Sequence, residues 1–148
     1  MRFEKLSYFE KKSFLERVYK KLNKELFNGE LPNVDVIIEN LDDNMDGCFT
    51  ANNSFYDKDR ISISIQFVER LEKLRTQKEQ IFQIVCLLTH EMCHVYCSYN
   101  HLDDSNHSSV WQEVANTHGL EVCYENGVCI NETARLALVI VSTRISIK

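Results

Sequence analysis

Apolar residues recur at steps of three and four between residues 78 and 98, with polar residues between them. This spacing places the apolar side chains along one face of an α-helix, so the pattern predicts a buried amphipathic helix from Lys78 to Ser98. The residues on this face are Ile81, Val85, Leu88, Met92 and Val95. A helix of this kind packs against a core by its stripe and turns its polar face toward a cleft.

The same spacing occurs near the N-terminus, where a second apolar stripe is formed by Leu15, Val18, Leu22 and Leu26. Ser7 and Glu10 have the spacing of a capping box, which marks the start of a helix. Phe27 continues the stripe, and Gly29 and Pro32 then mark its end. We therefore expect a first helix over about residues 7–27 that packs on the rest of the protein.

Three short segments have the composition of strands. Residues 34–39 and 61–67 alternate or are rich in β-branched residues, and a short strand is expected at 48–50 within a turn-rich stretch of Asn, Asp and Gly at 40–59. Combined with the helical segments, they predict an α+β fold in which helices pack on a small mixed sheet.

The C-terminal third predicts a helix, a hairpin and a strand. Residues 107–118 have an apolar side and end at Gly119, so His118 is interpreted as a helix-end histidine and not as a metal ligand. Asn126-Gly127 is typical of a type I′ turn and predicts a hairpin over residues 121–131. Residues 136–141 are interpreted as a strand because Val and Ile are concentrated there.

The six cysteines are expected to be reduced. In the predicted hairpin Cys123 would lie opposite Ile130 and Cys129 opposite Tyr124, so a disulfide between these cysteines is not expected. The N-terminus lacks the apolar run of a signal peptide, and no stretch approaches the roughly 20 apolar residues of a membrane span. These features predict a cytoplasmic protein without membrane contact, folded as one domain over residues 1–148.

One motif on the predicted helix indicates a chemistry. His90, Glu91 and His94 form the sequence H-E-x-x-H. Residues four apart lie on one helix face, roughly 5–6 Å apart, so the two imidazoles can bind one metal ion. A zinc ion held in this way lowers the pKa of a bound water, and the adjacent carboxylate can take that water's proton. The motif therefore predicts a zinc-dependent hydrolase that attacks amide carbonyls.

A catalytic zinc usually keeps three protein ligands, so the two histidines need a partner. A metzincin would have Gly and His three and six residues after His94, where this chain has Cys97 and Asn100. Two candidates remain. Glu113 lies nineteen residues after His94, as in a gluzincin, and His107 lies thirteen residues after it, in a polar loop that leads into the next predicted helix.

Several segments resemble the SprT-like zinc metallopeptidase family. Its core reads H-E-M-x-H, followed by a loop and then a histidine with an aromatic residue four positions later, as in His107 and Trp111 here. Residues 21–36 resemble the family's opening helix, Leu-Pro pair and strand. Residues 47–49 and 60–64 resemble its next two strands. The resemblance covers about residues 10 to 120.

The resemblance implies a zincin-like core, a Zn²⁺ cofactor and a peptidase activity on protein or peptide substrates. By similarity, His90, His94 and His107 would be the metal ligands and Glu91 the general base, and Glu113 would have no ligand role. Ser108 departs from the family's Gly after the third histidine, and the Cys-x-x-Cys pairs of the zinc ribbon carried by many relatives are absent. The residue that stabilises the oxyanion is left open among Tyr96, Tyr99 and His101.

Charge is distributed unevenly along the chain, whose net charge is −5. Residues 79–134 contain eight acidic residues and no Lys or Arg, whereas residues 2–24 contain eight basic and three acidic ones. An anionic site favours a cation or basic, unstructured substrate segments and repels a phosphate backbone. DNA-associated proteins are conceivable substrates through the family resemblance, but no aromatic platform for DNA accompanies the basic helix.

The alternative is a non-catalytic module that keeps zinc for folding and binds nucleic acid or protein through the basic first helix. The presence of Glu91 argues against this reading, because a structural zinc site needs ligands but no base.

Overall fold

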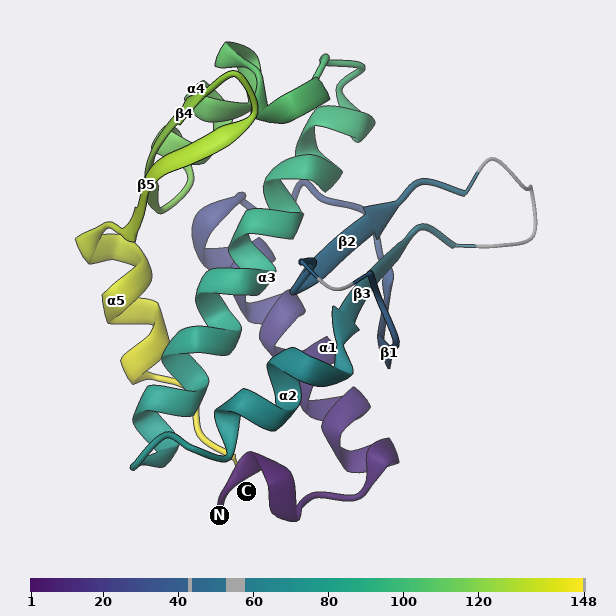
Figure 1. Ribbon diagram of the computed structural model, residues 1–148, viewed down its shortest axis with the longest axis vertical. Helices are drawn as coiled ribbons and strands as arrows, with labels where there is room; N and C mark the ends of the chain where they lie inside the picture. The colour runs from purple at the N-terminus through teal and green to yellow at the C-terminus, as the bar shows by residue number, and fades with distance from the viewer. Residues whose placement is uncertain (43, 53–57, 148) are drawn as a thin grey trace.

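The computed structural model describes residues 1–42, 44–52 and 58–147. Within these residues, five α-helices accompany a three-stranded mixed sheet and a two-stranded hairpin, which confirms the expected α+β fold (Figure 1). The helices are α1 (Tyr8–Leu26), α2 (Ile65–Leu71), α3 (Gln77–Tyr99), α4 (Ser109–Thr117) and α5 (Leu136–Thr143). The strands are β1 (Asp35–Glu39), β2 (Gly47–Thr50), β3 (Arg60–Ser64), β4 (Leu120–Glu125) and β5 (Val128–Ala134).

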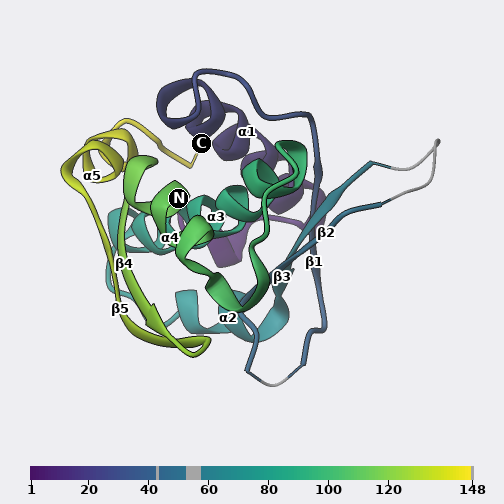
Figure 2. The same cartoon turned by 90° about the horizontal axis from the view of Figure 1, so that it is seen from above.

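Helix α3 is the central element, and it agrees with the predicted helix to within one residue at each end. It starts at a capping box in which Thr76 and Glu79 satisfy each other's backbone N–H groups. Its apolar stripe is buried, as expected. The three-stranded sheet lies on one side of α3, and α5 and the β4–β5 hairpin lie on the other (Figures 1 and 2).

The first helix also forms as predicted. Ser7 and Glu10 make the expected capping box at the start of α1, and its buried face packs against β1 and α3. In the last turn of α1, the side-chain amide of Asn23 donates to the Leu31 carbonyl and accepts from the Leu31 N–H. These bonds direct the chain through Pro32 into β1.

The sheet has the order β1-β3-β2, with β1 parallel and β2 antiparallel to β3. Strand β2 is therefore an edge strand, and it packs against α3. The prediction of a strand over residues 61–67 was wrong in its second half. The strand ends at Ser64, whose hydroxyl accepts a hydrogen bond from the Phe67 N–H at 3.0 Å and so starts α2. Residues 43 and 53–57 of the expected turn-rich stretch lie outside the described residues.

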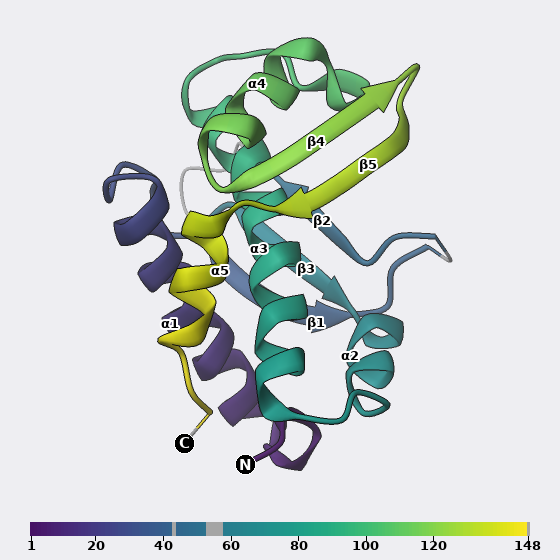
Figure 3. The ribbon, with the colours of Figure 1, turned by 90° about the vertical axis from the view of Figure 1, so that its left-hand side faces the viewer.

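The prediction of a strand at residues 136–141 was also wrong, because this segment is helix α5 (Figure 3). Leu138 and Val141 are three residues apart and buried, while Leu136 is exposed. The helix packs against α3 and α1, which bury one face of it. Tertiary packing has therefore outweighed the strand propensity of Val and Ile.

The predicted hairpin is confirmed, with Asn126 and Gly127 both at positive φ as a type I′ turn requires. Tyr124 lies opposite Cys129, as expected. Cys123 lies opposite Asn131 instead of Ile130, because a register irregularity follows Cys123. Both cysteines are exposed and unbridged. Among the described residues, no helix has the length and apolar character needed to cross a membrane.

Candidate active site

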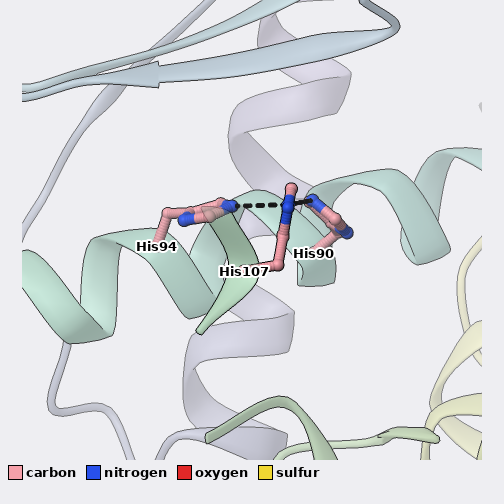
Figure 4. Close-up of side chains that lie close together, drawn as sticks. All are labelled: His90, His94 and His107. Carbon is pink, nitrogen blue, oxygen red and sulfur yellow. Dashed lines mark hydrogen bonds between the residues drawn. The ribbon is translucent and has the colours of Figure 1, made fainter. Parts of the chain in front are cut away.

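Three histidines from two parts of the chain converge at the C-terminal half of α3. His90 and His94 lie one turn apart on the helix, and His107 comes from the loop before α4. The Nε2 atom of His107 lies 3.1 Å from Nε2 of His90 and 3.3 Å from Nε2 of His94 (Figure 4). The structure thus brings together the three residues that the family resemblance implied as ligands, and it identifies them as a group able to hold a metal ion.

The loop that carries His107 is tightly held. Asn106 and His107 both have positive φ, a left-handed conformation that is uncommon outside glycine. The side-chain amide of Gln112 donates to the His107 carbonyl at 2.9 Å. Ser108, which replaces the family's usual Gly, donates its hydroxyl to the Asp103 carbonyl and accepts from the Trp111 N–H, so it caps α4. The departure from the family pattern therefore has a local structural role.

Two carboxylates hold the outer nitrogens of the helix histidines. His90 Nδ1 is 2.9 Å from Glu132 Oε1 on β5, and His94 Nδ1 is 2.7 Å from Asp104 Oδ2 in the loop. Tyr124 donates its hydroxyl to the same Glu132 oxygen at 2.6 Å. A carboxylate on Nδ1 fixes the ring as the tautomer with hydrogen on Nδ1, which leaves the Nε2 lone pair directed at the other histidines.

Sequence reasoning did not find these partners. Glu132 is separated from His90 by 42 positions and was identified only as one of the acids of the anionic half. Asp104 is close to His107 in sequence, but its partner is His94 on the helix. Both contacts depend on tertiary structure and have no spacing signature.

The protonation of the rings follows from burial and from neighbouring charges. Burial, with the charges of His90 and His94, lowers the pKa of His107 to about 4, so this ring is neutral at pH 7. Burial also lowers the pKa of His94, despite the bond to Asp104. For His90, burial lowers the pKa, but the Glu132 hydrogen bond and nearby carboxylates outweigh it and the net shift is upward. Neutral imidazole is the form that binds metals.

Two aromatic rings pack against the histidines. Trp111 is fully buried and contacts all three imidazoles, with ring centroids 4.5 to 5.1 Å apart. Tyr124 stacks on His107 at 4.4 Å, so the β4–β5 hairpin contacts both an imidazole face and, through Glu132, an imidazole nitrogen. The hairpin is consequently part of the site.

Glu91 lies beside this cluster, with Oε2 3.9 Å from His90 Nε2. Its side chain is only 6% exposed. Burial raises its pKa to about 7, although His90 and a backbone hydrogen bond from Phe49 on β2 act in the opposite direction. Gly47 on the same strand lies so close that a Cβ there would be 3.2 Å from Glu91 Oε2. The edge strand therefore confines the carboxylate next to the histidines.

The histidine nitrogens fit a zinc ion. Tetrahedral zinc with Zn–N bonds of about 2.0–2.1 Å separates its nitrogen ligands by roughly 3.3–3.4 Å. The observed separations of 3.1 and 3.3 Å are close to this value. The three histidines are half-buried, and nitrogens that meet lone pair to lone pair repel one another, a cost that a cation offsets. Three imidazoles, two of them with a carboxylate on Nδ1, form a ligand set that occurs in zinc sites with an open position.

The cluster opens into a cavity of about 690 Å³. The cavity is bounded by residues 44–49, which include the start of β2, and by Glu91, Tyr124 and Glu132. Lys and Arg are absent from its lining among the described residues, which agrees with the anionic character expected from the sequence.

The other candidates lie away from the histidine cluster. Glu113 is exposed on α4 and is not part of the metal-binding group found among the described residues. Tyr96, Tyr99 and His101 do not line the cavity. His118 follows the end of α4 and donates Nδ1–H to the Val114 carbonyl. Its ring stacks on Phe27, the residue that follows α1. It is therefore the helix-end histidine that was predicted.

Comparison with known proteins agrees with this architecture. The SprT-like family model matches residues 15–133, which include the second half of α1, strands β1 to β4, all but the last residue of β5, and all three histidines. The chain belongs to the SprT-like family. A search of curated proteins and a search of solved structures each found no significant match. Membership in the SprT-like family points to a metallopeptidase-type domain, and the histidine cluster that could bind a metal lies within the matched segment.

Proposed function

We propose that this SprT-like protein is a zinc-dependent metallopeptidase with a zincin-like core. The observation that carries the proposal is the convergence of three imidazole Nε2 atoms beside a buried glutamate. His90, His94 and His107 would hold the ion. When bound, zinc supplies a Lewis acid that polarises a peptide carbonyl and makes water acidic enough to react near neutral pH.

Glu91 is the proposed general base. It is close enough to the histidines to take a proton from the attacking water, and it then returns that proton to the nitrogen of the leaving amine. The C–N bond breaks, and the water oxygen remains on the new carboxylate. Phe49 and Gly47 of β2 hold the Glu91 side chain in this position.

The edge of the sheet supports a peptide as the substrate. Strand β2 is at the edge of the three-stranded sheet, and its first residues line the cavity that contains the histidines. An extended peptide can add to such an edge through main-chain hydrogen bonds. A scissile bond would then lie over Glu91 and the histidine cluster.

The proposal is tested by zinc content and by cleavage of an unfolded protein, measured for the wild type and for Glu91→Gln. The variant keeps the shape of the side chain but not the base. We expect one zinc per chain in both proteins and a rate lower by about 100- to 10,000-fold in the variant. Equal rates in the two proteins would contradict the role of Glu91.

DNA-associated proteins are proposed as one substrate group, and the same assay tests them. Arg17, Lys20 and Lys24 are exposed on α1 and offer positive charge, whereas Arg2 is occupied by the carbonyls of Glu72, Leu74 and Arg75. Stimulation of cleavage by single-stranded DNA, lost when the three α1 residues are changed to Gln, would support this substrate group. Rates unaffected by DNA would contradict it.

The competing function is a binding module that uses zinc only for stability. The exposed basic residues of α1 favour it. Zinc in both wild type and Glu91→Gln, with no cleavage of any unfolded protein, would favour this alternative.

A further inference from the structure

A second cavity of about 350 Å³ adjoins the histidine cavity, and we call it the side pocket. It lies between α2, α3 and the β4–β5 hairpin. Three residues, Asp46, Leu87 and Glu132, line both cavities. The two cavities therefore border on each other at these three residues, which we call the rim.

Six of the ten residues that line the side pocket are apolar: Leu87 at the rim, Phe67 of α2, Phe82 and Cys86 of α3, and Leu120 and Ala134 of the hairpin. Gln83 and Thr133 add polar groups to the lining. Burial raises the pKa of the Cys86 thiol to about 12, so this cysteine is an uncharged wall residue at neutral pH. One water molecule occupies about 30 Å³ in the liquid. The side pocket is roughly ten times larger, so it has room for a large side chain.

Two carboxylates stand at the rim, and both already have partners. Asp46 forms an ion pair with Arg70. Glu132 accepts from His90 and from Tyr124. Each carboxylate therefore has part of its negative charge offset by a partner already in place. Because most of the lining is apolar, the pocket favours an apolar occupant.

The position of the rim relates the side pocket to the scissile bond. Leu87 precedes His90 by three residues on α3, a rise of about 4.5 Å along the helix axis. One residue of an extended peptide spans about 3.3 Å. A peptide whose scissile bond lies at the histidine cluster would therefore place the side chain of an adjoining residue at the rim.

We propose that the side pocket binds an apolar side chain, of the size of leucine or phenylalanine, from the substrate residue that adjoins the bond to be cleaved. The inference rests on the proposed peptidase function. It also makes the site selective, because a buried apolar side chain contributes binding that alanine or a charged residue at that position does not.

Two variants that narrow the pocket from opposite walls test the proposal. Cys86→Phe fills it from α3, and Ala134→Leu fills it from β5. The matched control is Ala137→Leu, the same substitution at an exposed position on α5 that does not line the pocket. Circular dichroism and thermal unfolding identify any variant that fails to fold, and the second variant then carries the test.

The first arm maps cleavage sites in an unfolded protein such as reduced casein by mass spectrometry. In the wild type and in Ala137→Leu, we expect cleavage beside leucine, methionine or phenylalanine to exceed cleavage beside alanine or aspartate by about tenfold. In the narrowed variants this preference should shift toward small residues. A site profile that is the same in all folded proteins would overturn the proposal.

The second arm needs neither catalysis nor metal. Glu91→Gln protein is titrated with N-acetyl-leucine amide or N-acetyl-glycine amide, and the methyl signals of Leu87, Leu120 and Ala134 are followed by NMR. We expect shifts with the leucine probe only, and none in Cys86→Phe/Glu91→Gln. Leucine-dependent shifts, together with a wild type that cleaves no unfolded protein, would support the pocket while the peptidase function fails. Identical responses to both probes would overturn the pocket whether or not the protein is a peptidase.

Discussion

Helix α3 carries polar side chains at two levels, fully buried near its start and half-buried in its second half, and they differ in how their polar atoms are satisfied. Gln80, near the start of the helix, is fully buried. Its Oε1 accepts from the Phe3 N–H, and its Nε2 donates to Glu4 and to the Leu71 carbonyl. Every group of the amide has a partner of the right kind, so this cluster holds η1 (Phe3–Lys5) and the end of α2 on α3.

The histidines three turns later are arranged differently. The Nδ1 atoms of His90 and His94 have carboxylate partners, but the Nε2 atoms of these two residues and of His107 face one another. When the three rings are neutral, these acceptors have no donor within the cluster, and a cation satisfies all three. The comparison shows that polar side chains inside the protein do not by themselves indicate a functional site. A functional site is indicated by polar atoms whose remaining partner does not come from the chain.

The largest predicted effect concerns the rise in Tm that zinc binding produces. We expect His94→Ala to lower zinc affinity by about 100-fold or more, since each ligand of a zinc site contributes roughly 3 kcal/mol. The rise in Tm on adding zinc, present in the wild type, should then disappear. His118→Ala removes a histidine that is outside the cluster and should keep the rise. Equal zinc-dependent stabilisation of both variants would contradict the account.

Gln80→Ala should lower the stability of the fold and leave zinc binding unchanged. It leaves the buried Phe3 N–H without a partner and removes one of the two donors to the Leu71 carbonyl, so we expect the free energy of unfolding to fall by about 2–3 kcal/mol with no loss of zinc. Denaturant unfolding with and without zinc measures both quantities. Gln83→Ala, at an exposed position on the same helix, should change stability by less than about 0.5 kcal/mol. Loss of zinc in Gln80→Ala would remove the distinction between the two clusters.

Glu132 connects the site to the hairpin, and its removal should have an intermediate effect. We expect Glu132→Ala to weaken zinc binding by about 10- to 100-fold, because His90 loses the partner that orients its ring. Glu132→Gln can still accept from His90 and Tyr124 and should recover part of the loss. Glu121→Ala, an exposed glutamate on the facing strand, is the control in competition titrations with a zinc chelator. If Glu132→Gln binds zinc no better than Glu132→Ala, then Glu132 strengthens zinc binding through its charge and not by orienting the His90 ring.

The smallest effect concerns pH and the Gln80 cluster. Burial raises the pKa of Glu4, but hydrogen bonds from Arg2 and Gln80 outweigh it and lower the pKa to about 2. Because the folded-state pKa lies below the unfolded value, the stabilisation is present above about pH 4.5 and is lost as pH falls toward 2. We expect Glu4→Gln to be less stable by about 1–2 kcal/mol at pH 6, with the difference vanishing near pH 2. A difference independent of pH would contradict this.

Sequence patterns predicted the elements whose own periodicity is strong. The stripe of α3 and the capping box of α1 gave helices close to the observed bounds. They failed where a neighbour decides the outcome. Residues 136–141 form a helix because α3 and α1 cover one of its faces, and β3 ends early because Ser64 caps α2.

For the candidate site, the local motif and the resemblance indicated the three histidines and Glu91, and the structure brings all four together. The carboxylates on Nδ1 could not be predicted. Glu132 reaches His90 only because the hairpin folds over α3, and no spacing along the chain encodes that contact. Gly47 likewise becomes significant only when β2 is seen to pass over Glu91.

The most direct test of the account is the zinc content of His107→Ala and Glu113→Ala, purified under identical conditions and compared with the wild type. His107 points into the cluster and Glu113 is exposed on α4, although both had a spacing compatible with a third ligand. We predict one zinc per chain in the wild type and in Glu113→Ala, and little or none in His107→Ala. Stoichiometric zinc in His107→Ala would contradict the three-histidine site on which the proposed function rests.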